Sequence, residues 1–330
     1  MKIAILDDYQ DAVRGLDCFN LLDGHEVKVF NSSTRGLGQL ALRLAPFDAL
    51  VLIRERTVFP ANLLAKLPNL KLISQTGKVS GHVDVAAATG HGIAIAEGVG
   101  SPIAPAELTW ALIMAASRKI VPYANNLKDG LWQTASVNPV LNGVGRVLHG
   151  RTLALWSYGR IGKMVAGYAR AFGMRVLVWG SEASRAAALA DGFEAAPSRE
   201  ALFEQADVLS LHLRLAESTR GIVTASDLAR MKPDALFVNT SRAELVAEDG
   251  LEQALRQGRP GTAALDVFTS EPLAPDSPLL RIPTLLATPH LGYVEKDSYE
   301  IYFKAAFENI VQFAQGEPTN ILNPEALGKR

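Results

Sequence analysis

The sequence predicts an α/β protein with two doubly wound parallel sheets. Short apolar runs alternate with amphipathic stretches over residues 2–96, and a second series of the same kind runs over residues 152–288. Parallel strands need a crossover between them, so strands separated by helices indicate sheets of this type. The length of 330 residues also favours two domains, because it exceeds one typical domain.

The first series predicts five strands with helices between them. The strands are expected at Lys2–Leu6, Glu26–Phe30, Ala49–Ile53, Lys71–Ser74 and Ile93–Ala96. The helices are expected at Gly36–Leu44, Pro60–Lys66 and Val83–Ala88. Pro102 and Pro105 then open a long apolar helix that ends near Ser117, since proline suits a first helical turn.

The second series predicts a sheet of the dinucleotide-binding type. Its strands are expected at Leu153–Ser157, Arg175–Trp179, Val208–His212, Ala235–Asn239, Ala263–Val267 and Leu285–Thr288. Its helices are expected at Ile161–Phe172, Arg199–Gln205, Ala225–Met231 and Glu248–Gln257. This strand–helix alternation is typical of the Rossmann arrangement. A last amphipathic helix is expected near Glu295–Ala314.

The composition narrows the classes of protein that fit. A net charge of -1 favours neither a nucleic acid nor a membrane surface as partner. The one cysteine, Cys18, excludes an intramolecular disulfide, and no residues have metal-ligand spacing, so no metal is expected. The apolar run Leu108–Ala116 is much shorter than the ~20 residues that span a bilayer. A cytoplasmic protein that binds a small molecule is expected.

A glycine-rich turn follows the first strand of the second series. It reads Ser157-Tyr158-Gly159-Arg160-Ile161-Gly162 and leads into a helix. Gly159 allows close approach to a diphosphate, Gly162 allows tight packing of the helix, and the helix N-terminus attracts the negative charge. The usual fingerprint has glycine where Ser157 stands, and an unfavourable φ there would cost about 1 kcal/mol. Its place between a strand and a helix predicts a dinucleotide site.

Three later stretches supply a guanidinium, a carboxylate and an imidazole, each after a short apolar run. They are Ser241-Arg242, Asp266-Val267-Phe268 with Glu271-Pro272, and Thr288-Pro289-His290. Arg242 can grip a carboxylate with two parallel hydrogen bonds. His290 can carry a proton near neutral pH, and Glu271 can orient its ring. These are the protein groups that hydride and proton transfer at a 2-hydroxy acid require.

Together these motifs resemble the D-isomer-specific 2-hydroxyacid dehydrogenases over nearly the whole chain. The matching stretches are residues 150–153 with 159–162, 207–212, 238–242, 265–268 with 271–272, and 288–292. The resemblance implies an NAD(P)-dependent oxidoreductase that interconverts a D-2-hydroxy acid and its 2-oxo acid. It assigns catalysis to Arg242, Glu271 and His290, with His290 as the general acid and base.

The resemblance also implies a domain division. A discontinuous, flavodoxin-like substrate domain would comprise residues 1–101 plus 293–330, because the last helix returns to it. A Rossmann NAD(P)-binding domain would comprise residues 102–292, with the catalytic cleft between the two lobes. A homodimer through the 102–135 region is expected as well, because the helix ending at Ser117 is apolar on most faces and must be buried.

Several residues are expected to bind the cofactor. They are Thr109, Tyr158, Gly159, Arg160, Ile161, Gly162, Gly180, Ser181, Arg185, His212, Thr240 and Asp266. Asp266 is expected at the nicotinamide carboxamide. Gly180 stands where NAD-dependent relatives carry an aspartate that repels a 2′-phosphate. Glu182 can replace that aspartate, or Ser181 and Arg185 can hold a phosphate; the expectation is that NAD is favoured and NADP tolerated.

The substrate is less well specified. Strand-end loops of the first series place Arg54, Thr76, Gly77 and Lys78 as substrate-binding candidates. Arg54 and Lys78 either favour an extra anionic group on the substrate or are simply solvated. Two alternatives to a general 2-hydroxyacid dehydrogenase stay open: a phosphoglycerate-type dehydrogenase of a phosphorylated substrate, and a non-catalytic NAD(H)-binding regulator of the same fold.

Overall fold

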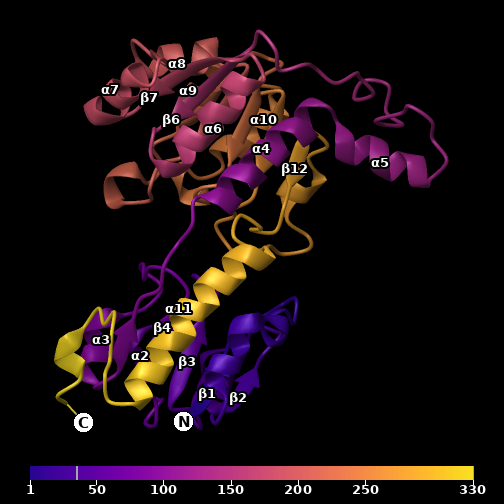
Figure 1. The fold of residues 1–330 in the computed structure, drawn as a ribbon. Helices are drawn as coiled ribbons and strands as arrows, with labels where there is room; N and C mark the ends of the chain where they lie inside the picture. Colours follow the sequence, from indigo (N-terminus) through magenta and orange to yellow (C-terminus); the bar gives the residue numbers. More distant parts are fainter. Residues whose placement is uncertain (35, 330) are drawn as a thin grey trace. The chain divides into compact units, whose positions relative to one another are not determined.

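The computed structural model describes residues 1–34 and 36–329, and it divides them into two compact units (Figure 1). Unit 1 comprises Met1–Ser101 and Val294–Arg330, and unit 2 comprises Pro102–Tyr293. Each unit contains one parallel sheet with helices, so the predicted fold class of two doubly wound α/β domains is confirmed. Within the described residues no helix combines the length and the apolar character needed to span a bilayer.

Unit 1 has, in its described residues, a five-stranded parallel sheet of order β2-β1-β3-β4-β5. The strands are β1 (Lys2–Ile5), β2 (Glu26–Val29), β3 (Ala49–Leu52), β4 (Leu72–Gln75) and β5 (Ala94–Ala96). The helices are α1 (Leu37–Leu44), α2 (Ala61–Leu64), α3 (Val85–Gly90) and α11 (Lys296–Ala314), with 3-10 turns η1 (Val13–Gly15), η2 (Asp17–Leu22) and η6 (Pro324–Ala326). Each predicted strand is found within one or two residues of its expected ends.

Helix α11 completes the core of unit 1 from the far end of the chain. Phe303 and Phe307 are fully buried, and each contributes roughly 1.5–3 kcal/mol through removal of its ring from water. Ser74 of β4 donates a hydrogen bond to Ala306 O at 2.8 Å. Glu300 accepts hydrogen bonds from the backbone of η2, at 2.6 Å from Asp17 N. The last helix is therefore part of unit 1.

Unit 2 has, over its own described range, a seven-stranded parallel sheet of order β12-β11-β10-β9-β6-β7-β8. The strands are β6 (Thr152–Trp156), β7 (Arg175–Trp179), β8 (Glu194–Ala195), β9 (Val208–Leu211), β10 (Leu236–Asn239), β11 (Thr262–Leu265) and β12 (Leu285–Ala287). The helices are α4 (Ile103–Ser117), α5 (Ile120–Lys128), α6 (Arg160–Ala171), α7 (Glu182–Ala190), α8 (Arg199–Gln205), α9 (Ala225–Arg230) and α10 (Gly250–Arg256). The shorter turns are η3 (Glu217–Thr219), η4 (Ala243–Leu245) and η5 (Pro278–Arg281). The strand order reverses between β6 and β9, which is where open sheets of this kind bind ligands.

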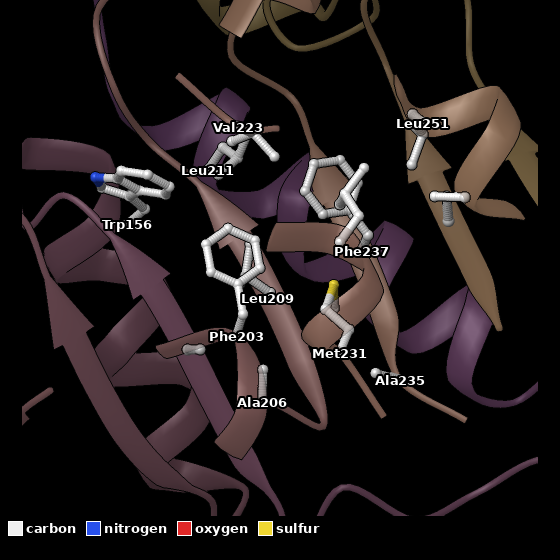
Figure 2. Packing of buried hydrophobic residues seen from close by; sticks show 14 of the residues in the cluster. Trp156, Phe203, Ala206, Leu209, Leu211, Val223, Met231, Ala235, Phe237 and Leu251 are labelled. Atoms are coloured by element: carbon white, nitrogen blue, oxygen red, sulfur yellow. The ribbon is translucent and has the colours of Figure 1, made fainter. Parts of the chain in front are cut away.

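Both faces of this sheet are covered, which explains why its strands are apolar almost throughout. Figure 2 shows one face, where Trp156, Phe203, Leu209 and Phe237 pack together. The opposite face packs against α4 and α6, with Val238 in that second core. Side chains of neighbouring residues in a strand point to opposite faces, so Phe237 and Val238 serve different cores.

Helices α5 and α7 and strand β8 of unit 2 were not among the expected elements. Helix α7 has an alanine-rich sequence without a clear apolar stripe, and Ser181 caps it by accepting a hydrogen bond from Ser184 N. Strand β8 has only two residues, too few to show a pattern. The apolar helix ends at Ser117 as predicted, and Lys119, whose φ is 51°, separates α4 from α5.

The segment after α4 projects from the body of unit 2 (Figure 1). We call residues 118–147 the arm. It consists of α5 and the irregular chain that follows, and it exposes an unusual number of apolar side chains. Trp132 is 76% exposed, Val140 90% and Val144 85%. The other exposed apolar side chains of the arm are Ile120, Val121, Leu127, Val137 and Val147.

Candidate active site

Arg242 follows β10 on a loop that hydrogen bonds hold in place. The buried Asn239 side chain accepts from Ser241 N at 3.0 Å and donates to Arg242 O at 2.9 Å. Ser241 Oγ donates to Leu213 O at 2.6 Å, which ties this loop to the end of β9. The Arg242 guanidinium itself donates to Ser241 O at 2.7 Å. The guanidinium is therefore positioned at the carboxyl end of the sheet, as predicted for a substrate-binding arginine.

His290 and Glu271 form a direct pair. His290 Nδ1 lies 2.6 Å from Glu271 Oε2, and Glu271 Oε1 accepts a hydrogen bond from Phe268 N at 2.8 Å. Burial alone raises the pKa of Glu271, but His290, then Phe268 N–H and Arg242, hold the pKa below its usual value. The ionised carboxylate can only accept, so Nδ1 carries a hydrogen and Nε2 is left for a ligand.

The turn that carries His290 is held by Asp266. Asp266 is fully buried, and it accepts hydrogen bonds from Thr288 Oγ1 at 2.7 Å, Leu291 N at 2.7 Å and Gly292 N at 2.9 Å. Burial raises the pKa of Asp266 against the effect of these donors. His290 adopts a φ of 53°, a left-handed conformation that the surrounding contacts must maintain. These contacts tie Asp266 to the His290 turn, and its contact with the nicotinamide carboxamide stays a prediction.

The glycine-rich turn after β6 fits a dinucleotide diphosphate. A Cβ on Gly162 would lie 2.7 Å from Ser157 O, so only glycine allows this packing of α6 against the turn. A Cβ on Gly159 would meet nothing within 4 Å, and no described side chain caps the N-terminus of α6 there. Open space before helical N–H groups suits an anion. Ser157 has a φ of 85°, the unfavourable value considered from the sequence.

Some predicted cofactor residues direct their polar groups to hydrogen bonds with other residues of the protein. Tyr158 is buried, its hydroxyl donates to Asp191 at 2.9 Å, and burial followed by Asp191 raises its pKa to about 12. Thr109 is fully buried and donates to Pro105 O, and its Oγ1 lies 2.7 Å from Thr240 Oγ1. Their predicted contacts with the cofactor stay predictions.

Other predicted cofactor residues lie at the start of α6 and at the end of β9. Arg160 is exposed at the first helical position, and Ile161 packs partly against the core. His212 follows β9, its Nε2 is 3.0 Å from Ser210 Oγ, and burial lowers its pKa to about 4. A neutral imidazole therefore stands beside the turn, close to where a Cβ on Gly162 would lie.

The end of β7 is the second place where the chain departs from the usual fingerprint. Gly180 has a φ of 153°, which side chains disfavour. The exposed Ser181 caps α7, and the Arg185 guanidinium lies over the Trp179 ring, 4.7 Å from its centroid. The structure thus brings these cofactor candidates together at one strand end.

The substrate candidates of unit 1 follow β3 and β4. Arg54 has a φ of 53°, and its guanidinium lies against Gly77, where a Cβ would collide with it. Thr76 is buried, and its hydroxyl accepts from Arg54 N at 3.0 Å. Lys78 is exposed and pairs with Glu97 at 2.8 Å. Arg54, Thr76 and Gly77 thus form one group, while Lys78 is engaged elsewhere.

Sequence reasoning did not single out two residues that organise these sites. Asn239 was included in a motif, but its amide shapes the Arg242 loop through both of its polar atoms. A buried asparagine at the end of an apolar strand was the available signal, since it needs several partners. Trp179 supports Arg185, and its place at the strand end was the signal there. Among the residues that the structure describes, His, Cys, Asp and Glu form no metal-binding group.

One sheet carries a histidine paired with a carboxylate, an arginine after β10 and a glycine-rich turn that leaves room for an anion. These features define a pyridine-nucleotide oxidoreductase that moves a hydride and a proton. Residues 110–292 match the family "D-isomer specific 2-hydroxyacid dehydrogenase, NAD binding domain". The chain belongs to this family, and it is an NAD(P)-dependent enzyme that interconverts 2-hydroxy acids and 2-oxo acids.

Individual relatives support the same assignment. Glyoxylate reductase from Aeropyrum pernix is 36% identical over 82% of this chain and 81% of its own length. A solved structure from Ralstonia solanacearum, provisionally assigned as a D-3-phosphoglycerate dehydrogenase oxidoreductase, is 58% identical, with a TM-score of 0.97 over 99% of this chain and 98% of that one. Phosphoglycerate oxidoreductase from Vibrio cholerae is 58% identical, with a TM-score of 0.92 over 96% of this chain and 99% of that one.

Proposed function

We propose that Arg242, Glu271 and His290 carry out the reaction on a D-2-hydroxy acid and its 2-oxo acid. The observation that supports this most strongly is the 2.6 Å contact between His290 Nδ1 and Glu271 Oε2. It leaves His290 Nε2 as the proton donor in reduction and the proton acceptor in oxidation. The bound nicotinamide supplies the hydride for reduction and accepts it in oxidation.

Arg242 binds the substrate carboxylate with its planar fork and so orients the adjacent carbon. Its positive charge also stabilises the developing negative charge on the substrate oxygen until His290 protonates it. Glu271 keeps the imidazole oriented. Asp266 acts through His290, because it holds the turn on which the imidazole stands.

The dinucleotide would be held by the turn at Gly159 and Gly162, with Arg160 and Ile161 at the start of α6. Tyr158, Thr109 and Thr240 would line its site, and His212 would contact it as a neutral imidazole. The open space at Gly159 supports this placement. Binding of NADH or NADPH to the isolated protein, measured calorimetrically, tests it.

The phosphoglycerate-type alternative is favoured by one specific finding. The two solved relatives at 58% identity carry that assignment, whereas the Aeropyrum pernix relative at 36% is a glyoxylate reductase. In this alternative Arg54, supported by Thr76 and Gly77, would bind the substrate phosphate. Arg54 lies 3.8 Å from Glu55, a looser ion pair than the 2.8 Å contact of Lys78 with Glu97, so Lys78 would be the less suited of the two.

A panel of 2-oxo acids tests both possibilities. Glyoxylate, pyruvate, hydroxypyruvate and phosphohydroxypyruvate would each be offered with NADH and with NADPH, and turnover read from loss of reduced cofactor. Arg54→Ala should impair only the phosphorylated acid, and Lys78→Ala is the matched control. Equal effects of Arg54→Ala on all four acids would contradict the phosphate role. Cofactor binding without turnover of any of the four acids would place the substrate outside this panel.

We further propose that the protein is a homodimer through the 102–135 region. The exposed apolar side chains of the arm support this, because patches of this kind on a monomer mark interaction surfaces. Sedimentation at micromolar concentration should give twice the chain mass of 35.4 kDa. A single species at the chain mass would contradict the dimer. Leu127→Asp should dissociate it, whereas the exposed Leu42→Asp in unit 1 should not.

A further inference from the structure

Two loops of unit 1 are joined by a buried pair of side chains, Gln75 and His82. Gln75 is the last residue of β4 and is fully buried, and His82, in the loop that follows, is buried as well. His82 Nε2 lies 3.3 Å from Gln75 Oε1. Gln75 Nε2 donates to Arg54 O at 3.0 Å, in the loop after β3. The pair therefore links the two loops that carry the substrate candidates of unit 1.

The hydrogen bonds of this pair have a fixed direction. Because the Gln75 amide nitrogen donates to Arg54 O, the amide oxygen faces His82 and must accept from it. His82 therefore carries a hydrogen on Nε2, and its Nδ1, 3.4 Å from Ser80 Oγ, accepts from that hydroxyl. The backbone also holds His82 in place, because Phe59 N donates to His82 O at 2.7 Å. A continuous chain of hydrogen bonds thus runs from Ser80 to Arg54 O.

Arg54 needs such support because its backbone conformation is unfavourable. Its φ of 53° lies in the left-handed region, which residues other than glycine disfavour. Thr76 Oγ1 accepts from Arg54 N at 3.0 Å, and Gln75 donates to Arg54 O, so the end of β4 holds the peptide groups on both sides of Arg54. In this conformation the guanidinium lies against Gly77, where a Cβ would collide with it. The direction of the Arg54 side chain therefore depends on the end of β4.

We infer that Gln75 and His82 position Arg54 for a substrate phosphate, and so set the preference for a phosphorylated over an unphosphorylated 2-oxo acid. The inference rests on the phosphate-binding role proposed for Arg54. Gln75 itself does not touch the substrate, because it is fully buried and both polar atoms of its amide are engaged. Without the Gln75 donor, Arg54 would relax from its left-handed conformation and its guanidinium would turn away. Gln75 and His82 are positioning residues.

The experiment measures selectivity, the ratio of kcat/KM for phosphohydroxypyruvate to kcat/KM for hydroxypyruvate, with the reduced dinucleotide that binds more tightly. Gln75→Leu keeps the size of the side chain and removes its hydrogen bonds. The ratio should fall about three- to tenfold, the effect of one lost hydrogen bond. The fall should lie in KM for phosphohydroxypyruvate, with kcat within about twofold, because Arg54 would bind the phosphate equally throughout the reaction.

Substitutions of His82 test the second member of the pair. His82→Phe removes the donor to Gln75 Oε1 and should lower the selectivity at least threefold. His82→Gln has an amide that can donate in its place, so the selectivity should return to within about twofold of the wild-type value. Equal losses in His82→Phe and His82→Gln would overturn the role of this hydrogen bond. These two variants also carry the test if Gln75→Leu does not fold.

A double-mutant cycle tests whether the pair acts through Arg54. Arg54→Ala removes the guanidinium, so adding Gln75→Leu to that variant should change the selectivity no further. If the two losses instead multiplied in the double variant, the pair would act by another route and the inference would fail.

Asn323→Ala is the matched control for the loss of buried hydrogen bonds in unit 1. Asn323 is buried, accepts from Ile95 N at 2.7 Å and donates to Ile93 O at 3.0 Å, beside the start of β5. Its replacement should lower the urea midpoint but leave the selectivity within about twofold. Circular dichroism would verify that each variant is folded. A change of selectivity equal to that of Gln75→Leu would assign the effect to general loosening of unit 1 and overturn the inference.

The outcomes separate this inference from the role on which it rests. A wild-type ratio in Gln75→Leu, together with a lowered ratio in Arg54→Ala, would overturn the inference alone. An unchanged ratio in Arg54→Ala, or no turnover of phosphohydroxypyruvate by the wild-type protein, would contradict the phosphate role of Arg54, and the inference with it.

Discussion

The two ends of the seven-stranded sheet are built in different ways. At β10, β11 and β12, side chains hold the reactive groups: Asn239 shapes the Arg242 loop, and Asp266 holds the His290 turn. At β6 and β7, the backbone makes the site through Gly159 and Gly162, and side chains are few. A network of hydrogen-bonded side chains tolerates few substitutions. A site that backbone groups form leaves its side chains free to vary. Two departures from the family pattern, Ser157 and Gly180, lie at this second end, and a third, Ala243 after Arg242, lies at the first.

The largest effect on activity should come from a change at His290, which lies at the β10–β12 end of the sheet. We expect His290→Ala to lower kcat by about 10²- to 10⁴-fold, the usual contribution of a general acid and base. Cofactor binding should stay within about twofold of the wild-type value, because the glycine-rich turn lies at the other end of the sheet. Steady-state kinetics and calorimetry measure the two effects. A folded variant with near-wild-type kcat would sink the assignment.

Arg242→Lys should have the next largest effect. Lysine keeps the charge but loses the planar two-point grip, so kcat/KM should fall by about a hundredfold. Arg214→Lys, on the loop after β9, serves as a control of the same type. A loss below about fivefold would place Arg242 outside the substrate site, and it would remove the contrast between the two ends.

Glu271→Gln should change the pH dependence more than the maximal rate. The pKa of Glu271 is lowered in the folded protein, so the carboxylate is ionised at neutral pH and pairs with His290. Loss of that charge should shift the pH–rate profile, because the carboxylate contacts the group that transfers the proton. The exposed Glu252→Gln is the control. Identical profiles for Glu271→Gln and wild type would argue against the pairing.

The same pKa shift has a consequence for stability. Because the folded-state pKa of Glu271 lies below its usual value, the pair with His290 contributes stability above the unfolded-state pKa. That contribution is lost as the pH falls through the folded-state pKa. The free energy of unfolding of Glu271→Gln should therefore fall less steeply with decreasing pH than that of the wild-type protein.

The smallest effect is expected in the glycine-rich turn after β6. Ser157→Gly should raise the free energy of unfolding by about 1 kcal/mol, because glycine adopts the φ of 85° without strain. The same substitution at Ser277, where φ is -50°, should lower stability. Urea denaturation followed by circular dichroism would measure both. A loss of stability in Ser157→Gly would show that the serine side chain contributes to the turn.

The fold was largely predictable from the sequence because buried strands appear there as short apolar runs. Arg175–Trp179 and Arg199–Gln205 were predicted to the residue. Most other strands and helices were predicted within one or two residues, since their burial leaves a clear pattern in the sequence. Helix α7 was not, because alanine can be helical without an apolar stripe, and its stability depends on the Ser181 cap and on packing.

The site residues were identified from the resemblance, but their contacts were not. No sequence pattern indicated that the Asp266 carboxylate accepts hydrogen bonds from three donors. Nor did any pattern indicate the ion pair between Lys78 and Glu97. These contacts join residues that are far apart in the sequence or depend on side-chain direction.

The return of α11 to unit 1 dictates an order of assembly during synthesis. A ribosome completes the five strands of unit 1 early, but Phe303 and Phe307 emerge only after the whole of Pro102–Tyr293. At 5–20 residues per second this delay is roughly 10–40 s. Unit 1 therefore lacks α11 against its sheet until synthesis is nearly complete, whereas unit 2 can finish folding before then.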